Sequence, residues 1–183
     1  MSALAVIAFV TGVLGVWLTI KQNILCWPMA LISVISSMLE FYNERLYGDM
    51  SLQVVYFFAG VYGWVYWEKN ARSDFKVRYT PVKVTPYLVA LTLVQAVIYF
   101  YLLKIFRGDQ PFFDAALTAA SLTATYMMIK KWVENWFAWV IIDAAYVFLY
   151  GIKDMWVFAA LYFFFAIIAF TGWIRWRKAA FIK

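Results

Sequence analysis

The sequence contains no histidine and a single cysteine, Cys26. The absence of histidine excludes imidazole metal ligands and a histidine proton relay. One cysteine cannot form an intrachain disulfide, and there is no cysteine cluster to bind a metal ion. A Gly-rich phosphate loop of the form G-x-x-x-x-G-K-[ST] is also absent, which excludes ATP hydrolysis by that route. We therefore expect a protein without a cofactor.

Charge is scarce, and this decides the class of protein. Only 14% of the 183 residues are charged, whereas 66% are hydrophobic and 22% are aromatic. An average soluble domain has about 25% charged residues. Apolar runs of roughly 17–20 residues recur along the chain, which is the length that a helix needs to cross a ~30 Å hydrocarbon layer. The runs are continuous and do not alternate with polar residues, so they predict an all-α integral membrane protein and not a β-barrel.

Short polar stretches divide the chain into seven apolar segments. We expect transmembrane helices at about 3–20, 27–43, 51–67, 87–103, 114–129, 136–150 and 156–174. Seven crossings place successive loops on alternate sides of the membrane, and the 16 lysines and arginines then divide 12 to 4. Because basic residues accumulate in cytoplasmic loops, this split predicts an N-terminus outside and a C-terminus inside. The same loops account for the net charge of +6, so we expect no nucleic-acid partner.

An internal repeat relates the two parts of the chain. The pentapeptides GWVYW (63–67) and GWIRW (172–176) lie 109 residues apart, and at the same offset Ile20-Lys21 matches Ile129-Lys130 and Trp27 matches Trp136. Duplication of a three-helix unit explains these matches, and the fourth segment then provides the crossing that makes the copies parallel. We expect a first repeat at 1–69, a cytoplasmic loop and linker helix at 70–108, and a second repeat at 109–183. The alternative is a chance match of aromatic residues at helix ends.

Four tryptophans lie at the ends of the third and seventh segments that face the cytoplasm in this topology. They are Trp64, Trp67, Trp173 and Trp176. Tryptophan is enriched where a membrane helix meets the lipid headgroups, because its ring is amphipathic. We expect these four side chains to form an interfacial aromatic belt.

One carboxylate, that of Asp143, lies at the centre of the sixth segment. It shares one helix face with aromatic residues at helical spacing, Trp136, Trp139, Tyr146 and Tyr150. A carboxylate in mid-membrane costs about 2.5–3.5 kcal/mol on insertion scales. Every lysine and arginine lies in a loop, so its partner is water, a hydroxyl such as that of Thr123, a proton or a ligand. We interpret Asp143 as a functional residue, with the Trp139 indole beside it as a platform for an aromatic or cationic ligand.

Other segments carry polar faces as well. Asn43 ends the second segment, Gln53 belongs to a polar face of the third, and Thr123 lies near a hydroxyl stripe on the fifth. Such side chains bridge packed helices as readily as they contact a ligand, and a residue near a segment end can simply meet water. The fourth segment is almost wholly apolar, as expected of a peripheral linker.

The chain resembles the Pnu-type vitamin transporters. The resemblance is carried by NWFAWVIID (135–143), the two GWxxW ends, SLTAT (121–125) and the three-plus-one-plus-three order of the segments, and it covers essentially the whole chain. It implies a SWEET-like fold and a homotrimer in the bacterial inner membrane. It also implies inward movement of nicotinamide riboside by facilitated diffusion without ATP, followed by metabolic trapping through a cytoplasmic kinase.

The resemblance further implies a substrate site. Carried over position by position, this site uses Asn135, Trp139, Asp143, Asn43, Gln53, Thr123, Tyr150 and Tyr162. Nicotinamide riboside has a cationic pyridinium ring suited to stacking, an amide suited to asparagine or glutamine, and ribose hydroxyls suited to a carboxylate and a threonine.

Three alternatives to this function can be compared from the sequence. Related family members carry thiamine, riboflavin or deoxynucleosides on the same scaffold, so the first alternative is another vitamin or nucleoside. An intramembrane enzyme needs a nucleophile with a base, or paired carboxylates, and Asp143 has no second acid in mid-span. We therefore expect no enzymatic activity. A channel or a structural membrane protein is the third alternative, although channel linings are rarely so aromatic and a structural bundle needs no central aspartate.

Overall fold

The computed structural model describes residues 2–43, 45, 47–73, 75–105, 111–152 and 154–181. The chain forms two compact units, Met1–Phe75 and Lys76–Lys183. The expected boundary between the linker helix and the second repeat, at residues 108 and 109, lies outside the described residues. The division into 1–69, 70–108 and 109–183 therefore stays a prediction.

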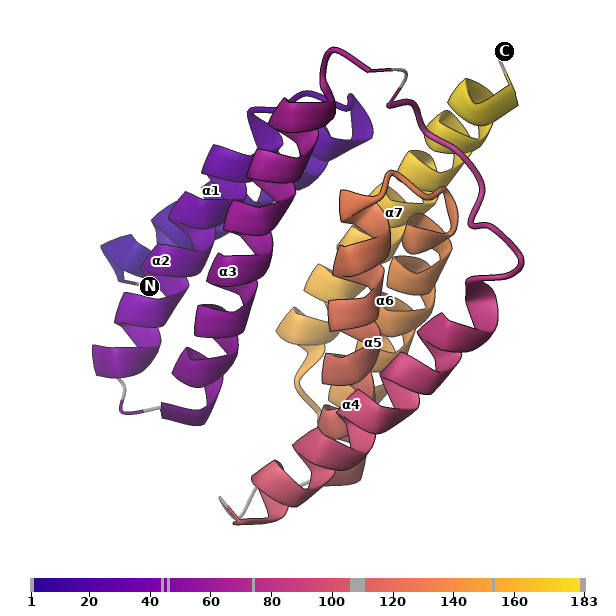
Figure 1. Cartoon of the computed structure of the whole chain (residues 1–183). Coiled ribbons are helices and arrows are strands. Elements are labelled where there is room, and N and C mark those ends of the chain that lie inside the picture. The colour runs from indigo at the N-terminus through magenta and orange to yellow at the C-terminus, as the bar shows by residue number, and fades with distance from the viewer. Residues whose placement is uncertain are drawn as a thin grey trace. The chain divides into compact units, whose positions relative to one another are not determined.

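Seven helices occupy the described residues, and Figure 1 labels each of them. They are α1 (Ala3–Ile20), α2 (Cys26–Asn43), α3 (Tyr47–Asn70), α4 (Thr85–Ile105), α5 (Pro111–Ile129), α6 (Glu134–Ile152) and α7 (Trp156–Phe181). The predicted all-α class is confirmed, and each apolar segment corresponds to one helix. The predicted and observed helix ends differ most at the end of α7. The apolar run stops before Arg175, while the helix continues through the charged residues that follow.

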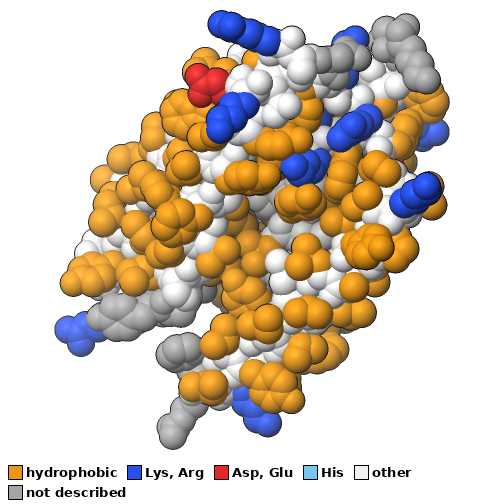
Figure 2. All heavy atoms as spheres, in the orientation of Figure 1, with side chains coloured by type: hydrophobic (Ala, Val, Ile, Leu, Met, Phe, Trp, Pro, Cys, Tyr) orange, Lys and Arg blue, Asp and Glu red, His pale blue; other side chains and the backbone are white. Residues whose placement is uncertain are grey.

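Five of these helices are long and apolar enough to cross a membrane: α1, α4, α5, α6 and residues 159–181 of α7. Over the part of the chain that the structure describes, α2 and α3 do not reach that apolarity, since α2 carries three serines and Glu40, and α3 mixes its apolar residues with Gln53, glycines and tyrosines. On the face shown in Figure 2, hydrophobic side chains cover the helices and basic side chains lie toward their ends. The chain is a multi-pass membrane protein, and seven crossings stay a prediction.

In the first unit, α2 packs against both α1 and α3. The contact with α1 depends on small residues. A Cβ at Gly12 would lie 3.0 Å from Ser33 Oγ, and one at Gly15 would lie 3.4 Å from the Ala30 nitrogen. The Ser33 hydroxyl donates to the Ala8 carbonyl at 2.7 Å. Glycines in membrane helices allow this close backbone approach, and the hydroxyl adds a bond between the two helices.

The start of α2 is fixed against α3 by Trp27. Its ring meets that of Trp67 edge to face, with centroids 5.4 Å apart and an interplanar angle of 90°. The Trp27 ring also lies directly on Gly63, where a Cβ would overlap it. An aromatic pair of this geometry contributes about 0.5–1.5 kcal/mol beyond the area that it buries.

The second unit contains the same arrangement 109 residues later. Trp136 at the start of α6 meets Trp176 of α7 edge to face, with centroids 5.5 Å apart and an angle of 87°. A Cβ at Gly172 would lie 2.6 Å from the Trp136 ring. The sequence match between the two GWxxW motifs is therefore also a match of contacts.

The helix-connecting turns match at the same offset. Gln22 and Lys131 have φ angles of 55° and 54°, and Arg45 and Asp154 have φ angles of 60° and 56°. Residues other than glycine rarely adopt this left-handed conformation. The backbone thus agrees at turn positions where the residue types differ, which supports the proposal that the chain contains two copies of one three-helix unit.

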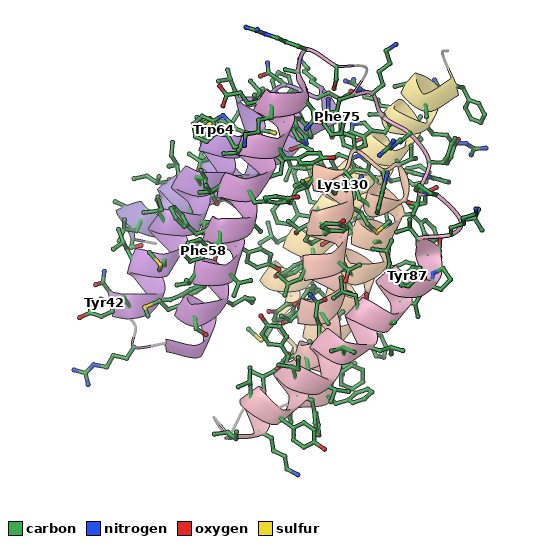
Figure 3. All side chains as sticks on the ribbon, in the orientation of Figure 1. Tyr42, Phe58, Trp64, Phe75, Tyr87 and Lys130 are labelled. Atoms are coloured by element: carbon green, nitrogen blue, oxygen red, sulfur yellow. The ribbon has the colours of Figure 1, made fainter. Side chains whose placement is uncertain are left out.

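The prediction that Trp67 and Trp176 belong to an interfacial belt is wrong. Their exposed fractions are 3% and 0%, whereas Trp64, labelled in Figure 3, is 36% exposed. In GWxxW the glycine and the second tryptophan are four residues apart, so they share one helix face. The glycine makes room for an indole from the neighbouring helix, and the second tryptophan packs on that indole. The motif is a packing motif.

We expect Gly172→Ala to lower the melting temperature of the detergent-purified protein. The new methyl group would press on the Trp136 ring, and overpacking of this kind costs about 1–3 kcal/mol, or roughly 3–10 °C for a chain of this size. Gly151→Ala is the matched control, because nothing lies within 4 Å of a Cβ there. Since alanine is the better helix former, the control should be neutral or stabilising. Equal melting temperatures for the two variants would contradict the role given to Gly172.

In the second unit α4 packs along α5, α5 packs against α6, and α6 packs against α7. The segment before α4, residues 76–84, returns to the α5–α6 turn, and we call it the strap. Its Arg78 N–H donates to the Lys131 carbonyl at 3.1 Å, and the Arg78 carbonyl accepts a bond from the turn at 3.0 Å. The Thr80 N–H and hydroxyl both donate to Glu134 Oε2, at 2.8 and 2.6 Å. The strap therefore holds the first turn of α6.

Candidate functional site

One face of α6 carries a row of polar and aromatic side chains. The row consists of Asn135, Trp139, Asp143, Tyr146 and Tyr150. Their spacings of three and four residues place them on one helix face. At 1.5 Å per residue the row extends about 22 Å, nearly the whole length of the helix. The other side of α6 exposes large hydrophobic side chains, as expected of a surface that meets lipid.

Asp143 is buried in the middle of this row, with an exposed fraction of 6%. The sequence has no lysine or arginine between Lys131 and Lys153, so α6 itself provides no cation for the carboxylate. Tyr162 of α7 lies close enough to interact with it electrostatically. Placing a charge in an apolar environment without a counter-ion is expensive, and such residues in membrane helices are typically functional.

Three tyrosines stack beside the carboxylate. Tyr162 lies 4.5 Å from Tyr146 and 5.4 Å from Tyr150 between ring centroids, with interplanar angles of 24° and 14°. Tyr146 and Tyr150 lie 6.0 Å apart at 21°. The predicted site contains Tyr150 and Tyr162 but omits Tyr146, although its position on the same helix face was visible in the sequence. The stack forms an aromatic wall one helical turn from Asp143.

Trp139 occupies the position between the amide of Asn135 and the carboxylate of Asp143. It is half-buried, and among the rings that the structure describes it stacks on none. An indole face is the preferred protein surface for a planar cation, and a carboxylate one turn away compensates the positive charge. The two side chains together suit a ligand with a cationic aromatic ring.

Asn135 lies in the first turn of α6 and is completely buried. Its Nδ2 donates to the Trp132 carbonyl at 2.6 Å, while its Oδ1 has no hydrogen-bond partner among the described residues. The neighbouring Trp136 Nε1 is likewise buried without an acceptor. A buried acceptor without a donor costs about 1–3 kcal/mol, so a ligand N–H that reaches Oδ1 would gain more than an ordinary hydrogen bond.

The structure places Thr123 with α4 and not with Asp143. Its hydroxyl lies 2.8 Å from Thr92 Oγ1 and donates to Gln95 Oε1 at 3.2 Å. A threonine has one hydroxyl hydrogen, and this cluster uses it. The bonds indicate that Thr123 packs α5 against α4, which is the alternative that the sequence left open. A substrate contact at Thr123 stays a prediction.

The two remaining predicted residues belong to the first unit. Asn43 is exposed at the end of α2, and Gln53 is half-buried on α3, close to the same turn in the chain. The other predicted residues all belong to the second unit. A common site that uses residues of both units stays a prediction.

The chain is similar to known transporters over nearly its whole length. The sequence profile of the family described as "Nicotinamide mononucleotide transporter" matches residues 2–178. The nicotinamide riboside transporter PnuC of Escherichia coli strain K12 is 25% identical over 208 residues, which cover 98% of this chain and 87% of that protein. The riboflavin/roseoflavin transporter RibM of Streptomyces davaonensis is 26% identical over 140 residues, which cover 73% of this chain and 65% of that protein.

A solved structure shows the same fold. The crystal structure of the vitamin B3 transporter PnuC superposes with a TM-score of 0.77 at 24% sequence identity, and the match covers 97% of this chain and 81% of that one. At this level of identity, the similarity shows the fold alone. The helical arrangement is therefore one that a transporter is known to adopt.

Proposed function

Because the chain belongs to the nicotinamide mononucleotide transporter family, we propose that it moves nicotinamide riboside across a membrane by facilitated diffusion. The family is one of transporters and not of enzymes. The name of the E. coli relative supports the riboside as the substrate. The α6 row of the second unit supports it independently, through the chemistry of its side chains.

The observation that carries the proposal is the Trp139 indole, which stacks on none of the described rings and lies one helical turn from a buried carboxylate. The pyridinium ring of the riboside would lie on Trp139, with its positive charge compensated by Asp143. The carboxamide N–H would donate to Asn135 Oδ1, which has no described donor. The tyrosine stack offers hydroxyls and ring faces to the ribose. Each functional group of the ligand would thus meet a partner in the α6 row or in the tyrosine stack beside it.

The same row favours the riboside over the mononucleotide. A phosphate adds roughly −1.5 to −2 charges at neutral pH. The apolar stretches of α5, α6 and α7 contain Asp114 and Asp143 but no basic residue that could compensate this charge. The positive ring of the riboside is attracted by Asp143, whereas the phosphate of the mononucleotide is repelled.

We expect purified protein to bind nicotinamide riboside on the order of 100-fold more tightly than nicotinamide mononucleotide, because like charges placed together cost several kcal/mol. Isothermal titration with both compounds at constant ionic strength measures the difference. Nicotinic acid riboside, which has a carboxylate in place of the amide, is the matched control and should also bind weakly. Equal binding of all three compounds would contradict the assignment of the substrate.

A second candidate substrate is riboflavin, which the similarity to RibM favours. The three stacked tyrosines give a broad aromatic surface that would also suit a tricyclic ring. Charge separates the two candidates, because the flavin ring is neutral. If the substrate is the riboside, Asp143→Asn should weaken its binding; if the substrate is riboflavin, the same variant should change its affinity little.

We propose a bacterial inner-membrane location with the N-terminus outside and the C-terminus inside, as the 12-to-4 division of basic residues predicts. In a Cys26→Ala background, Asp154→Cys should react with an impermeant maleimide on intact cells. Ser73→Cys should react only after permeabilisation, since the two loops lie on opposite sides in this topology. Both positions are exposed in the structure. Labelling of both from outside would overturn the topology.

We also propose that metabolic trapping after entry gives the transport its direction, and that three copies of the chain assemble. The family resemblance carries both proposals. The three-plus-one-plus-three plan is supported by the matched contacts of Trp27 and Trp136 and by the matched left-handed turns. Alternating access would then follow from movement of one repeat relative to the other.

A further inference from the structure

A hollow of about 340 Å³ lies beside α4 and α5 in the second unit. Leu88, Leu93 and Met127 contribute to its apolar wall, and Thr80 and Glu134 mark the end next to the strap. None of these residues belongs to the proposed riboside site. The only predicted site residue in the lining is Thr123, whose hydroxyl is bonded to α4.

The hollow has little to offer a polar solute. Thr92 and Thr123 line it, but their hydroxyls lie 2.8 Å apart and bond to each other. Thr92 Oγ1 also contacts the Leu88 carbonyl at 2.8 Å. The Thr80 hydroxyl donates to Glu134 at 2.6 Å. Because these hydroxyls already form hydrogen bonds within the protein, the surface that the hollow presents to a ligand is largely hydrocarbon.

The hollow opens toward the lipid-facing side of α4. Val89 and Leu93, which line it, are both more than half exposed. Tyr87 in the first turn of α4, labelled in Figure 3, is also strongly exposed. Because α4 is one of the apolar spans, these side chains meet the hydrocarbon layer, and a lipid chain can enter from the side.

Positive charge surrounds the strap end of the hollow. Residues 76–89 and 123–134 contain Lys76, Arg78, Lys83, Lys130 and Lys131, against Glu134 as their single acid. Lys83 lies between the lining residues Thr80 and Thr85, and Arg78 precedes Thr80 by two positions. Figure 2 shows lysine and arginine side chains gathered over this end of the second unit. Thr80 holds the carboxylate of Glu134 through two hydrogen bonds.

We propose that this hollow binds one acyl chain of an anionic phospholipid, whose phosphate is held by Arg78 and Lys83. The acyl chain leaves one hydrocarbon environment for another, so the hollow contributes through shape complementarity, by seating the chain where its phosphate lies beside Arg78 and Lys83. The basic residues provide the preference for an anionic headgroup, as in the basic pockets by which membrane helices bind such lipids. Two basic residues near a membrane surface are expected to favour an anionic over a zwitterionic lipid by about 30-fold.

The test measures lipid retention by the full-length protein in native mass spectrometry. Phosphatidylglycerol and phosphatidylcholine with identical acyl chains compete for the protein in mixed micelles. We expect phosphatidylglycerol to be retained preferentially. The double variant Arg78→Gln, Lys83→Gln should lose the preference, and Leu93→Trp, which fills the hollow, should lose retention of the lipid. Lys104→Gln, at the other end of α4, is the matched control and should behave as the unchanged protein.

Two results of the lipid competition would overturn the proposal. One is equal retention of both lipids by the unchanged protein, since the basic residues would then select nothing. The other is a loss of lipid preference in Lys104→Gln as large as that in the double variant, since the loss would then reflect the net charge of the protein and not the position of the basic residues. Glycerol phosphate, a soluble compound with the headgroup but no acyl chain, should not displace the lipid. If it did, the protein would bind the phosphate alone, and the hollow would have no role. None of these measurements depends on riboside binding or transport.

Discussion

Trp139→Ala should weaken the binding of nicotinamide riboside about 30-fold or more while the protein stays folded. A cation over a desolvated indole gains about 2 kcal/mol or more, which corresponds to this change in Kd. Trp139 is half-buried, so its removal leaves no large cavity in the core. Isothermal titration on purified protein measures the loss, and the elution volume in size-exclusion chromatography reports on folding.

Phe148→Ala is the matched control for this variant. Phe148 is an aromatic residue of the same helix with an exposed fraction of 69%, and it lies outside the polar row. Its truncation should leave riboside affinity unchanged. Asp143→Asn should weaken binding as Trp139→Ala does, and the double variant should lose less than the sum of the two, because both side chains are proposed to contact one charged ring. Normal binding by Trp139→Ala would show that the row is a packing surface, and additive losses would show that the two side chains do not act on the same ring.

The helices could be predicted from the sequence, because a long apolar run in lipid can satisfy its backbone hydrogen bonds within one segment only by forming a helix. Helix ends were harder to predict. The seventh segment was expected to end at residue 174, but α7 continues to Phe181, because charged residues such as Arg175 and Lys178 are good helix formers that hydropathy counts as loop.

Most of the α6 row could also be predicted, because it depends on helical periodicity. Asn135 was named only through the resemblance, and Trp136, expected on this face, packs on Trp176 and Gly172 instead. Asp143 and Trp139 lie on one face whatever the rest of the chain does. Thr123 was less certain, because its environment depends on which helix lies beside α5. Its hydroxyl is bonded to Thr92 and Gln95 of α4, and no local pattern in the sequence identifies that neighbour.

In the repeat, the sequence pattern and the packing contacts agree over several residues at once. Matches between GWVYW and GWIRW, taken alone, were open to chance. The edge-to-face pairs of Trp27 with Trp67 and Trp136 with Trp176 have centroid distances of 5.4 and 5.5 Å. The prediction that the tryptophans of GWxxW form an aromatic belt was nevertheless wrong for Trp67 and Trp176, because an amphipathic tryptophan suits a membrane interface and a core contact equally well. Only the neighbouring helix decides between them.

Reconstituted protein should equilibrate its substrate and not concentrate it when the membrane potential is clamped to zero. An ion-coupled carrier holds a proton or cation near the substrate, usually on intramembrane carboxylates or on the carbonyls of broken helices. Within the described part of the chain, the helices are continuous, and α2 continues through Pro28, which lies in its first turn, where proline is tolerated. Asp143 is the one carboxylate in the α6 row, and the substrate charge is proposed to occupy it.

The riboside is itself a cation, so a potential alone should drive it. An inside-negative potential of 100 mV contributes about 2.3 kcal/mol for each charge, which corresponds to roughly 50-fold accumulation. The reduced riboside, which has the same shape without the charge, is the matched control and should reach equal concentrations at any potential. Radiolabel uptake into liposomes with a potassium-clamped potential measures both. A proton or sodium gradient at zero potential should add nothing, because Asp143 cannot hold a coupling ion while it compensates the pyridinium ring. Accumulation of either compound under such a gradient would show that the carboxylate binds the ion, and the facilitated-diffusion mechanism would then be wrong.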